Sequence, residues 1–202
     1  MTEPIRVWLT EAFLPLLEEI NTFGAMFLAE ANEQFGADFV QAAMNRKLCT
    51  VVSTPHGEVV FLLQRARVMV GINSHYSPTA AQLVNVVCQR DAYHSIRQSG
   101  HEIEQIQRGR RKALTYTKDG RKVLALVQAE GYLRLVVRRI YKGEIISGNF
   151  DELHLYSYVS PVEMESLGRA LLYPTDVSAL EIDSSRFYLY SLKPWPVIHP
   201  QI

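Results

Sequence analysis

The amino-acid sequence predicts an α+β protein with a largely antiparallel sheet, and three observations support this class. Apolar residues recur at three- and four-residue steps over the first forty-odd residues, which is the period of a helix. Later runs rich in β-branched and aromatic residues are separated by short turns, as in hairpins. Helix and strand patterns do not alternate regularly, which disfavours a doubly wound parallel sheet. We therefore expect hairpins and a three-strand meander packed with an N-terminal helix and two further helices.

The order of these patterns predicts one domain over residues 1–202. It comprises a helical segment (1–47), a sheet-containing body (48–192) and a Pro-rich tail (193–202). The helical segment rests on nine apolar positions: Leu9, Phe13, Leu16, Leu17, Ile20, Phe23, Phe27, Leu28 and Ala31. Thr10 is the expected N-cap, Pro15 kinks the helix or delays its start, and Gly36 with Asp38 marks a break before a helix over 39–47. The apolar stripe either packs on the protein's own sheet or mediates self-association.

The next segments predict a hairpin and a second helix. Runs 49–53 and 58–63 flank the turn 54–57, while 64–72 is ambiguous. Ser77 then caps a helix that has Pro78 at its first position, and this helix stops at Ser99-Gly100.

The clearest local pattern predicts the three-strand meander. Its strands are 111–117, 121–128 and 132–141, separated by 118–120 and 129–131. If Asp119-Gly120 forms a two-residue turn, Thr117 faces Lys122, Thr115 faces Leu124 and Ala113 faces Leu126. A longer bulged loop is the alternative, and it would shift this alignment.

The C-terminal third predicts further strands around one helix. Residues 152–159 form a strand, and Ser160-Pro161-Val162-Glu163 is a capping box for a helix to about Leu172. Runs 179–182 and 186–192 are late strands, whereas the prolines of the tail exclude regular structure.

Composition indicates an ordinary globular chain, with 202 residues, 48% apolar and 21% charged. No N-terminal signal pattern or long apolar run is present, so we expect a soluble cytoplasmic protein that does not enter a membrane. Cys49 and Cys88 both lie in apolar surroundings, which favours reduced thiols. No zinc-binding spacing occurs, and we expect neither a metal nor a cofactor.

Charge is segregated along the chain even though the net charge is zero. Residues 90–142 carry thirteen Lys/Arg and five Asp/Glu, whereas the flanks together carry eight and sixteen. A local field of this kind attracts polyanions. The meander face that would combine basic and aromatic groups is the predicted nucleic-acid or polyanion site: Arg108, Arg110, Arg111, Lys112, Tyr116, Lys118, Arg121, Tyr132, Arg134 and Arg138. The alternative is that a helix covers this face and acidic residues pair with the arginines.

Other residue groups support weaker hypotheses. Asn73, Ser74, His75 and Tyr76 precede a predicted helix start and form a candidate anion pocket, where an enzyme would act on a phosphate-bearing substrate. The N-terminal helix or the tail would serve a homo-oligomer or a protein partner. Alternating side chains on two late strands are attributed either to an exposed face or to packing between strands: Glu152, His154, Tyr156, Tyr158, Tyr188 and Tyr190. Because phosphate-loop and nucleophile-elbow motifs are absent, a non-enzymatic binding or regulatory protein is the leading prediction.

Overall fold

The computed structural model describes residues 11–72, 77–109, 111–174 and 180–194. Backbone contacts divide the chain into two compact units, residues 1–87 with 195–202 and residues 88–194. The boundary falls within helix α6 (Ala80–Gln98). The predicted α+β class is confirmed, and among the described residues four of the six strand pairs are antiparallel.

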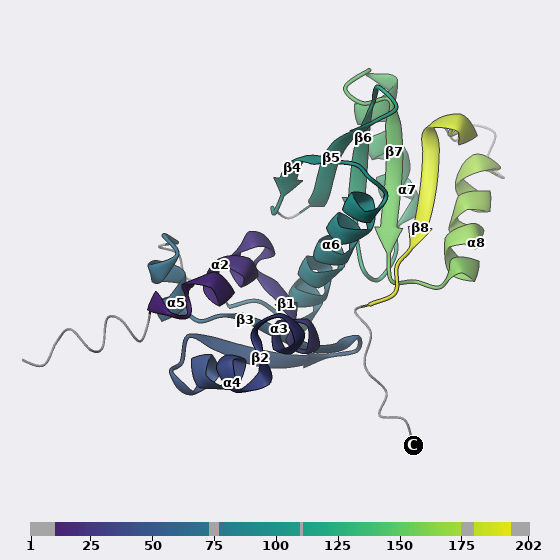
Figure 1. Cartoon of the computed structure of the whole chain (residues 1–202). Helices are drawn as coiled ribbons and strands as arrows, with labels where there is room; N and C mark the ends of the chain where they lie inside the picture. Colours follow the sequence, from purple (N-terminus) through teal and green to yellow (C-terminus); the bar gives the residue numbers. More distant parts are fainter. Residues whose placement is uncertain (1–10, 73–76, 110, 175–179, 195–202) are drawn as a thin grey trace, which may run out of the picture. The chain divides into compact units, whose positions relative to one another are not determined.

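Over its described residues, the N-terminal unit contains helices α2 to α5, the first part of α6 and a small sheet (Figure 1). In chain order its elements are α2 (Leu14–Phe23), β1 (Ala25–Phe27), α3 (Leu28–Phe35), α4 (Ala37–Asn45), β2 (Cys49–Thr54), β3 (Gly57–Leu62) and α5 (Gln64–Met69). The strand order is β1-β3-β2, and both pairings are antiparallel. The predicted hairpin is thus confirmed as β2–β3.

Two glycines divide the predicted N-terminal helix. Gly24 ends α2 with a left-handed φ of +108°, and the chain then enters β1, a strand that the sequence pattern does not predict. Gly36, with a φ of +90°, separates α3 from α4 at the predicted break, although α4 begins at Ala37, two residues earlier than expected. Pro15 lies in the first turn of α2, so it delays the start of the helix instead of kinking it. The predicted cap Thr10 lies outside the described residues.

The apolar stripe of this segment is buried inside its own unit. Leu16, Leu17 and Ile20 of α2 pack in one core with Val40 and Ala43 of α4. Met26, Val60 and Leu62 of the sheet join the same core. Packing on the protein's own sheet therefore accounts for the stripe.

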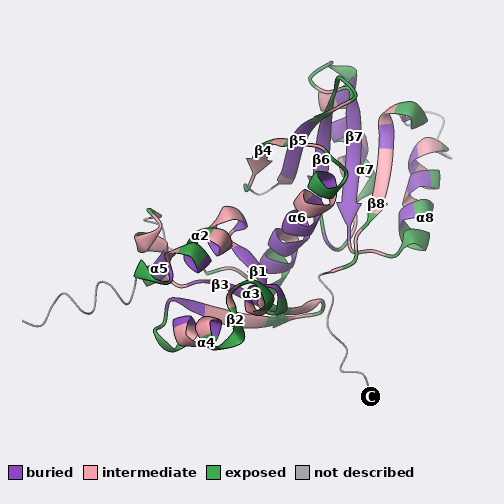
Figure 2. Cartoon of the chain, viewed as in Figure 1, coloured by how far each residue is buried: buried purple, intermediate pink, exposed green. Residues whose placement is uncertain are grey.

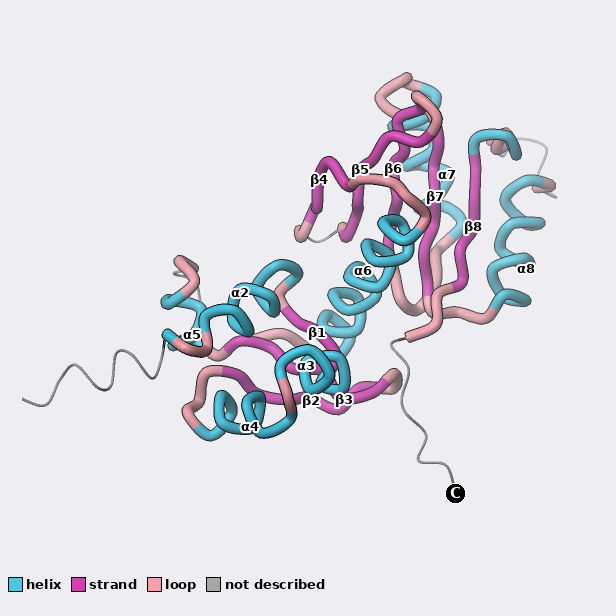
Figure 3. Tube along the Cα trace, viewed as in Figure 1, coloured by secondary structure: helices cyan, strands magenta, loops and turns pink. Residues whose placement is uncertain are grey.

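The C-terminal unit is built on a five-stranded mixed sheet (Figure 3). Its elements after α6 are β4 (Ile103–Gln107), β5 (Lys112–Lys118), β6 (Arg121–Val127), α7 (Arg134–Ile140), the π-helix η1 (Tyr141–Ile146), β7 (Glu152–Ser157), α8 (Pro161–Leu172), the 3₁₀-helix η2 (Ser184–Arg186) and β8 (Phe187–Ser191). The strand order is β4-β5-β6-β7-β8. The first three strands form an antiparallel meander, whereas β7 runs parallel to both β6 and β8.

The predicted alignment of β5 and β6 is confirmed. Thr117 lies opposite Lys122, Thr115 opposite Leu124, and Ala113 opposite Leu126. The two turn residues, Asp119 and Gly120, have φ values of +50° and +76°. Left-handed backbone at both positions gives the twist that a two-residue hairpin requires.

The predicted third meander strand, 132–141, is wrong, because this segment forms α7 and begins η1. Val137, Ile140, Tyr141 and Ile145 are buried at helical spacing, which favours a helix once their face packs on the sheet. The meander instead gains β4, a strand that is not predicted from the sequence. The predicted strand 179–182 is also wrong over its described part, since 180–182 form no strand.

Both faces of the central strands β5, β6 and β7 are buried. On one face α7 and α8 cover Ala113, Leu124 and Leu126, with Ser160 and Glu163 forming the predicted capping box of α8. The opposite face carries Leu114, Val123, Ala125 and Val127, which are also buried (Figure 2). Residues 88–98 of α6 lie on this side, where Gln89 donates hydrogen bonds to the Gln107 and Ala113 carbonyls.

Candidate functional site

The predicted polyanion-binding residues do not lie together on one face of the structure. Arg110 and the predicted pocket Asn73, Ser74, His75 and Tyr76 lie outside the described residues. Tyr116, Lys118 and Arg121 contact side chains of β7 and β8. Arg111, Lys112, Tyr132 and Arg138 make contacts within the fold. Arg134 is exposed on α7.

Tyr116, His154, Glu152 and Arg121 form a continuous chain of hydrogen bonds, which we call the polar network. The Tyr116 hydroxyl lies 2.8 Å from Nδ1 of His154, and His154 Nε2 lies 2.9 Å from Oε2 of Glu152. Arg121 Nη1 completes the chain 3.0 Å from Oε1 of Glu152. The alternation of β7 places Glu152 and His154 on one side of the sheet, and the β5–β6 hairpin places Tyr116 and Arg121 beside them.

One arrangement of protons satisfies every member of the polar network. His154 is fully buried, and burial lowers its pKa, although the Glu152 carboxylate opposes this shift. Burial raises the pKa of Glu152, but hydrogen bonds from His154 and Arg121 outweigh that effect and lower it overall. An ionised Glu152 therefore accepts from Nε2–H of a neutral His154, whose Nδ1 accepts from the Tyr116 hydroxyl.

The polar network is suited to holding the strands together. Its order resembles that of a nucleophile, a base and an orienting acid. However, Tyr116 is only 2% exposed, and burial raises its pKa to about 12, so the phenol is neutral at physiological pH. A buried neutral phenol offers no accessible nucleophile, and the network therefore acts as a rigid polar link between β5, β6 and β7.

The rings around the polar network are also packed against one another. Tyr190 stacks on Tyr156 with centroids 4.5 Å apart, and Tyr188 lies 4.8 Å from the ring of His154. Lys118 places its Nζ 5.0 Å from the centre of the Tyr188 ring. Lys118 therefore makes a cation–π contact within the fold.

Four other predicted residues have roles in the fold. The Tyr132 hydroxyl is within hydrogen-bond distance of the carbonyls of Leu126 and Tyr156, at 2.8 and 2.7 Å. Arg138 donates to the carbonyls of Leu180 and Ala170. Lys112 is half-buried and donates to the carbonyl of Arg108, and Arg111 lies 3.8 Å from Glu144. Arg108 itself is exposed.

A basic helical surface lies on α7 and η1 and consists of Arg134, Arg139 and Lys142. All three side chains are exposed, and within the described parts of the chain none has a carboxylate or hydrogen-bond partner. Leu135 and Ile146 lie beside them and are 81% and 54% exposed. This surface combines unpaired cations with exposed apolar groups on one helical face.

The sequence prediction includes Arg134 but misses Arg139 and Lys142. Both lie inside the basic middle of the chain, and the spacing of Leu135, Arg139, Lys142 and Ile146 is helical. A helical interpretation of this segment would have grouped them. The sequence shows two members of the polar network, because Glu152 and His154 alternate onto one face of a predicted strand. Their partners Tyr116 and Arg121 become neighbours only when β5, β6 and β7 pair in the folded protein.

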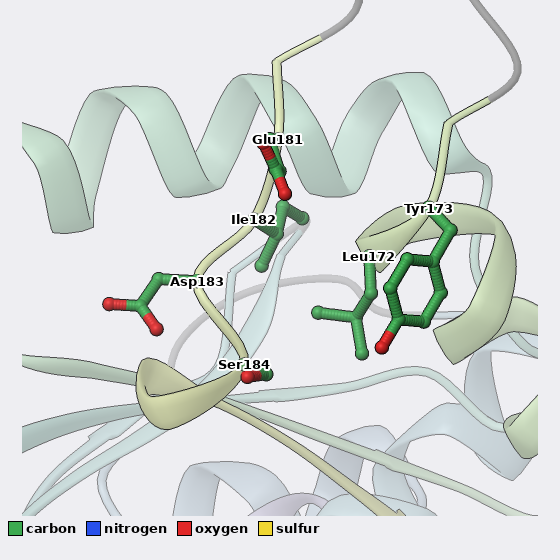
Figure 4. A pocket seen from close by; sticks show the side chains of 6 residues that line it. All are labelled: Leu172, Tyr173, Glu181, Ile182, Asp183 and Ser184. Atoms are coloured by element: carbon green, nitrogen blue, oxygen red, sulfur yellow. The ribbon is translucent and has the colours of Figure 1, made fainter.

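A hollow lies next to α8 (Figure 4). It has a volume of about 420 Å³ and is lined by Leu172, Tyr173, Glu181, Ile182, Asp183 and Ser184. Asp183 already accepts hydrogen bonds from the amide and hydroxyl of Ser185. With two carboxylates in its lining, this hollow disfavours a polyanion.

Within the described ranges, no three His, Cys, Asp or Glu side chains are placed together so that they could hold a metal ion. Within those ranges, no helix combines the length and the apolar composition needed to cross a bilayer.

Comparisons with known proteins identify no relative. No family model, no curated protein and no solved structure matches this chain. A functional assignment therefore rests on the chemistry of its own residues.

Proposed function

We propose that this protein binds nucleic acid through the basic helical surface of its C-terminal unit. The observation that carries the proposal is the exposure of Arg134, Arg139 and Lys142, which have no partners among the residues that the structure describes. Unpaired cations on one face attract phosphate, and each phosphate contact releases a counterion. This proposal keeps the polyanion ligand predicted from the basic middle of the sequence and moves its contact surface from the meander to α7.

The local charge balance supports a polyanionic ligand. From Arg134 to Ile146 the chain carries four cations, Arg134, Arg138, Arg139 and Lys142, and one carboxylate, Glu144. Glu144 lies near Arg111 and accepts from Asn149, so it does not neutralise the exposed cations. The exposed Leu135 and Ile146 side chains add apolar contact area for sugars or unstacked bases.

The test is a fluorescence-polarisation titration of the full chain with labelled single- and double-stranded DNA and RNA over a salt series. The double variant Arg139→Glu/Lys142→Glu should bind at least tenfold more weakly at 50 mM salt. Its plot of log affinity against log salt should also flatten, by roughly 0.7 to 0.9 per lost phosphate contact.

A matched control is Arg65→Glu/Lys193→Glu, which changes the net charge by the same amount at two exposed positions elsewhere. This control should bind within threefold of the wild type. Equal losses in both variants would show that only net charge matters, and unchanged binding in the Arg139→Glu/Lys142→Glu variant would refute the proposed surface.

A further inference from the structure

Exposed apolar side chains of the C-terminal unit gather on one helical layer. This helical layer consists of α7, η1, α8 and the segment 180–184, and its inner side packs on the sheet. Among the described residues, six large apolar side chains are more than half exposed, and one of them, Val68, lies in the N-terminal unit. The other five lie on the helical layer or directly before α7: Leu133 (72%), Leu135 (81%), Ile146 (54%), Val162 (75%) and Tyr173 (75%). Such a gathering is typical of a surface that binds another protein.

Helices α7 and α8 lie side by side in the helical layer. The guanidinium group of Arg138 on α7 donates to the carbonyl of Ala170 on α8 at 2.9 Å and to that of Leu180 at 3.2 Å. Val137 of α7 and Leu171 of α8 are buried in one core with residues of the sheet. The exposed side chains of both helices therefore point away from the sheet.

The two halves of the helical layer carry opposite charge. The α7 half, residues 132–147, has four cations and one carboxylate, which gives a net charge of +3. The α8 half, residues 160–174 and 180–184, has one cation, Arg169, which pairs with Glu165. Its other carboxylates are Glu163, Glu181 and Asp183, so four negative charges and one positive charge give −3. Each half thus combines exposed apolar groups with the charge that the other half attracts.

We propose that two copies of this protein form a dimer through the helical layer, with α7 of each copy against α8 of the other. A two-fold axis that runs between α7 and α8 produces this isologous contact. It places the +3 half of each copy on the −3 half of its partner and covers the exposed apolar groups of both. An arrangement with α7 against α7 would oppose like charges, so charge also selects the orientation of the two copies.

The dimer and nucleic acid would use the same cations. Arg139 and Lys142 belong to the α7 half, so α8 of a second copy covers the basic helical surface. Dimerisation therefore competes with nucleic-acid binding. This consequence rests on the proposed function, whereas the dimer itself does not.

The experiment is sedimentation equilibrium of the full chain without nucleic acid, in which the wild type should show reversible monomer–dimer association. Leu135→Ser and Val162→Ser each remove an apolar group from both symmetric contacts, so each should raise the dissociation constant at least about tenfold. Val68→Ser is the matched control, since this side chain is 55% exposed in the other unit, and it should dimerise like the wild type. A wild type that stays monomeric up to roughly 200 µM, or normal dimerisation of both layer variants, would refute the inference.

Charge variants test the pairing of α7 with α8. Arg139→Glu/Lys142→Glu makes both halves acidic, and Glu165→Lys/Glu181→Lys makes both halves basic. Each variant alone should be monomeric, whereas a mixture has opposite charges at both contacts and should form a heterodimer. Persistent homodimers of either variant, or no heterodimer in the mixture, would show that α7 does not pair with α8. All four side chains are exposed, so circular dichroism should show folded variants.

A labelled DNA duplex separates this inference from the α7 proposal. The duplex should convert dimers into monomers bound to DNA. Val162→Ser leaves α7 intact and should bind DNA roughly two- to tenfold more tightly at concentrations where the wild type is mostly dimeric. A dimer that binds no DNA contradicts only the α7 proposal, and DNA binding by a strictly monomeric wild type contradicts only the dimer. Dimers that bind DNA without dissociating would show that the two surfaces differ from those assigned.

Discussion

Removing one hydroxyl from the polar network tests whether it links the strands of the C-terminal unit. Tyr116→Phe keeps the ring and removes the donor that lies 2.8 Å from Nδ1 of His154. His154 is 0% exposed, so water cannot replace this donor without opening the sheet. Leaving a buried acceptor unsatisfied costs about 1–3 kcal/mol. We therefore expect the free energy of unfolding of this unit to fall by that amount.

The assay is urea unfolding followed by circular dichroism, combined with hydrogen exchange to locate the loss in β5, β6 and β7. Tyr188→Phe is the matched control, since that hydroxyl donates to the carbonyl of Ser185 at an exposed site. The control should change stability by less than about 0.5 kcal/mol. An equally small effect of Tyr116→Phe would refute the role given to the network.

Three further predictions concern stability and reactivity. Burial lowers the pKa of His154 below 6.5, and the hydrogen bonds of Glu152 lower its pKa below 4.5. As the pH is lowered, the unfolded chain therefore takes up each of these protons before the folded chain does. The urea concentration at the unfolding midpoint should decrease as the pH drops below about 6.5, and decrease again below about 4.5. Ser160→Ala removes one half of the capping box of α8 and should cost about 1 kcal/mol in the same unfolding assay, whereas no loss would exclude a capping contribution. Burial raises the pKa of Cys49 to about 11 and that of Cys88 well above its usual range, so both thiols should react with Ellman's reagent at pH 8 only after unfolding. Rapid reaction of the folded protein would contradict the burial of these thiols.

Local sequence signals predicted the elements that depend on local chemistry. The Asp119-Gly120 turn fixes the alignment of β5 with β6, because both residues adopt left-handed backbone easily. The Ser160–Glu163 capping box and the break at Gly36 were predictable for the same reason. In each case a few adjacent residues determine the geometry.

Segments 132–141 and 103–107 could not be assigned so easily. The first is rich in Val, Ile and Tyr, which favour strands, yet its apolar residues also fit a helical period, and packing on Leu124 and Leu126 decides between the two. The second contains only two apolar residues and becomes a strand because it pairs with β5. Parallel pairing of β6 with β7 likewise joins residues far apart in the sequence.

The candidate site was predictable in its chemistry and not in its position. The basic middle of the chain was evident from charge alone, but the helix at 134–140 separates Arg134 and Arg139 from the meander. Tyr116 becomes a buried hydrogen-bond donor because β7 brings His154 beside it. Neither arrangement can be inferred without knowing which strands are neighbours.

The most direct test of nucleic-acid binding is the affinity of the full chain for a labelled DNA duplex between 50 and 300 mM salt, measured with and without the Arg139→Glu/Lys142→Glu change. We expect measurable binding by the wild type, a linear fall of log affinity with log salt, and a shallower slope in the variant. Absence of binding to any DNA or RNA at 50 mM salt, or identical slopes for the two proteins, would contradict the account.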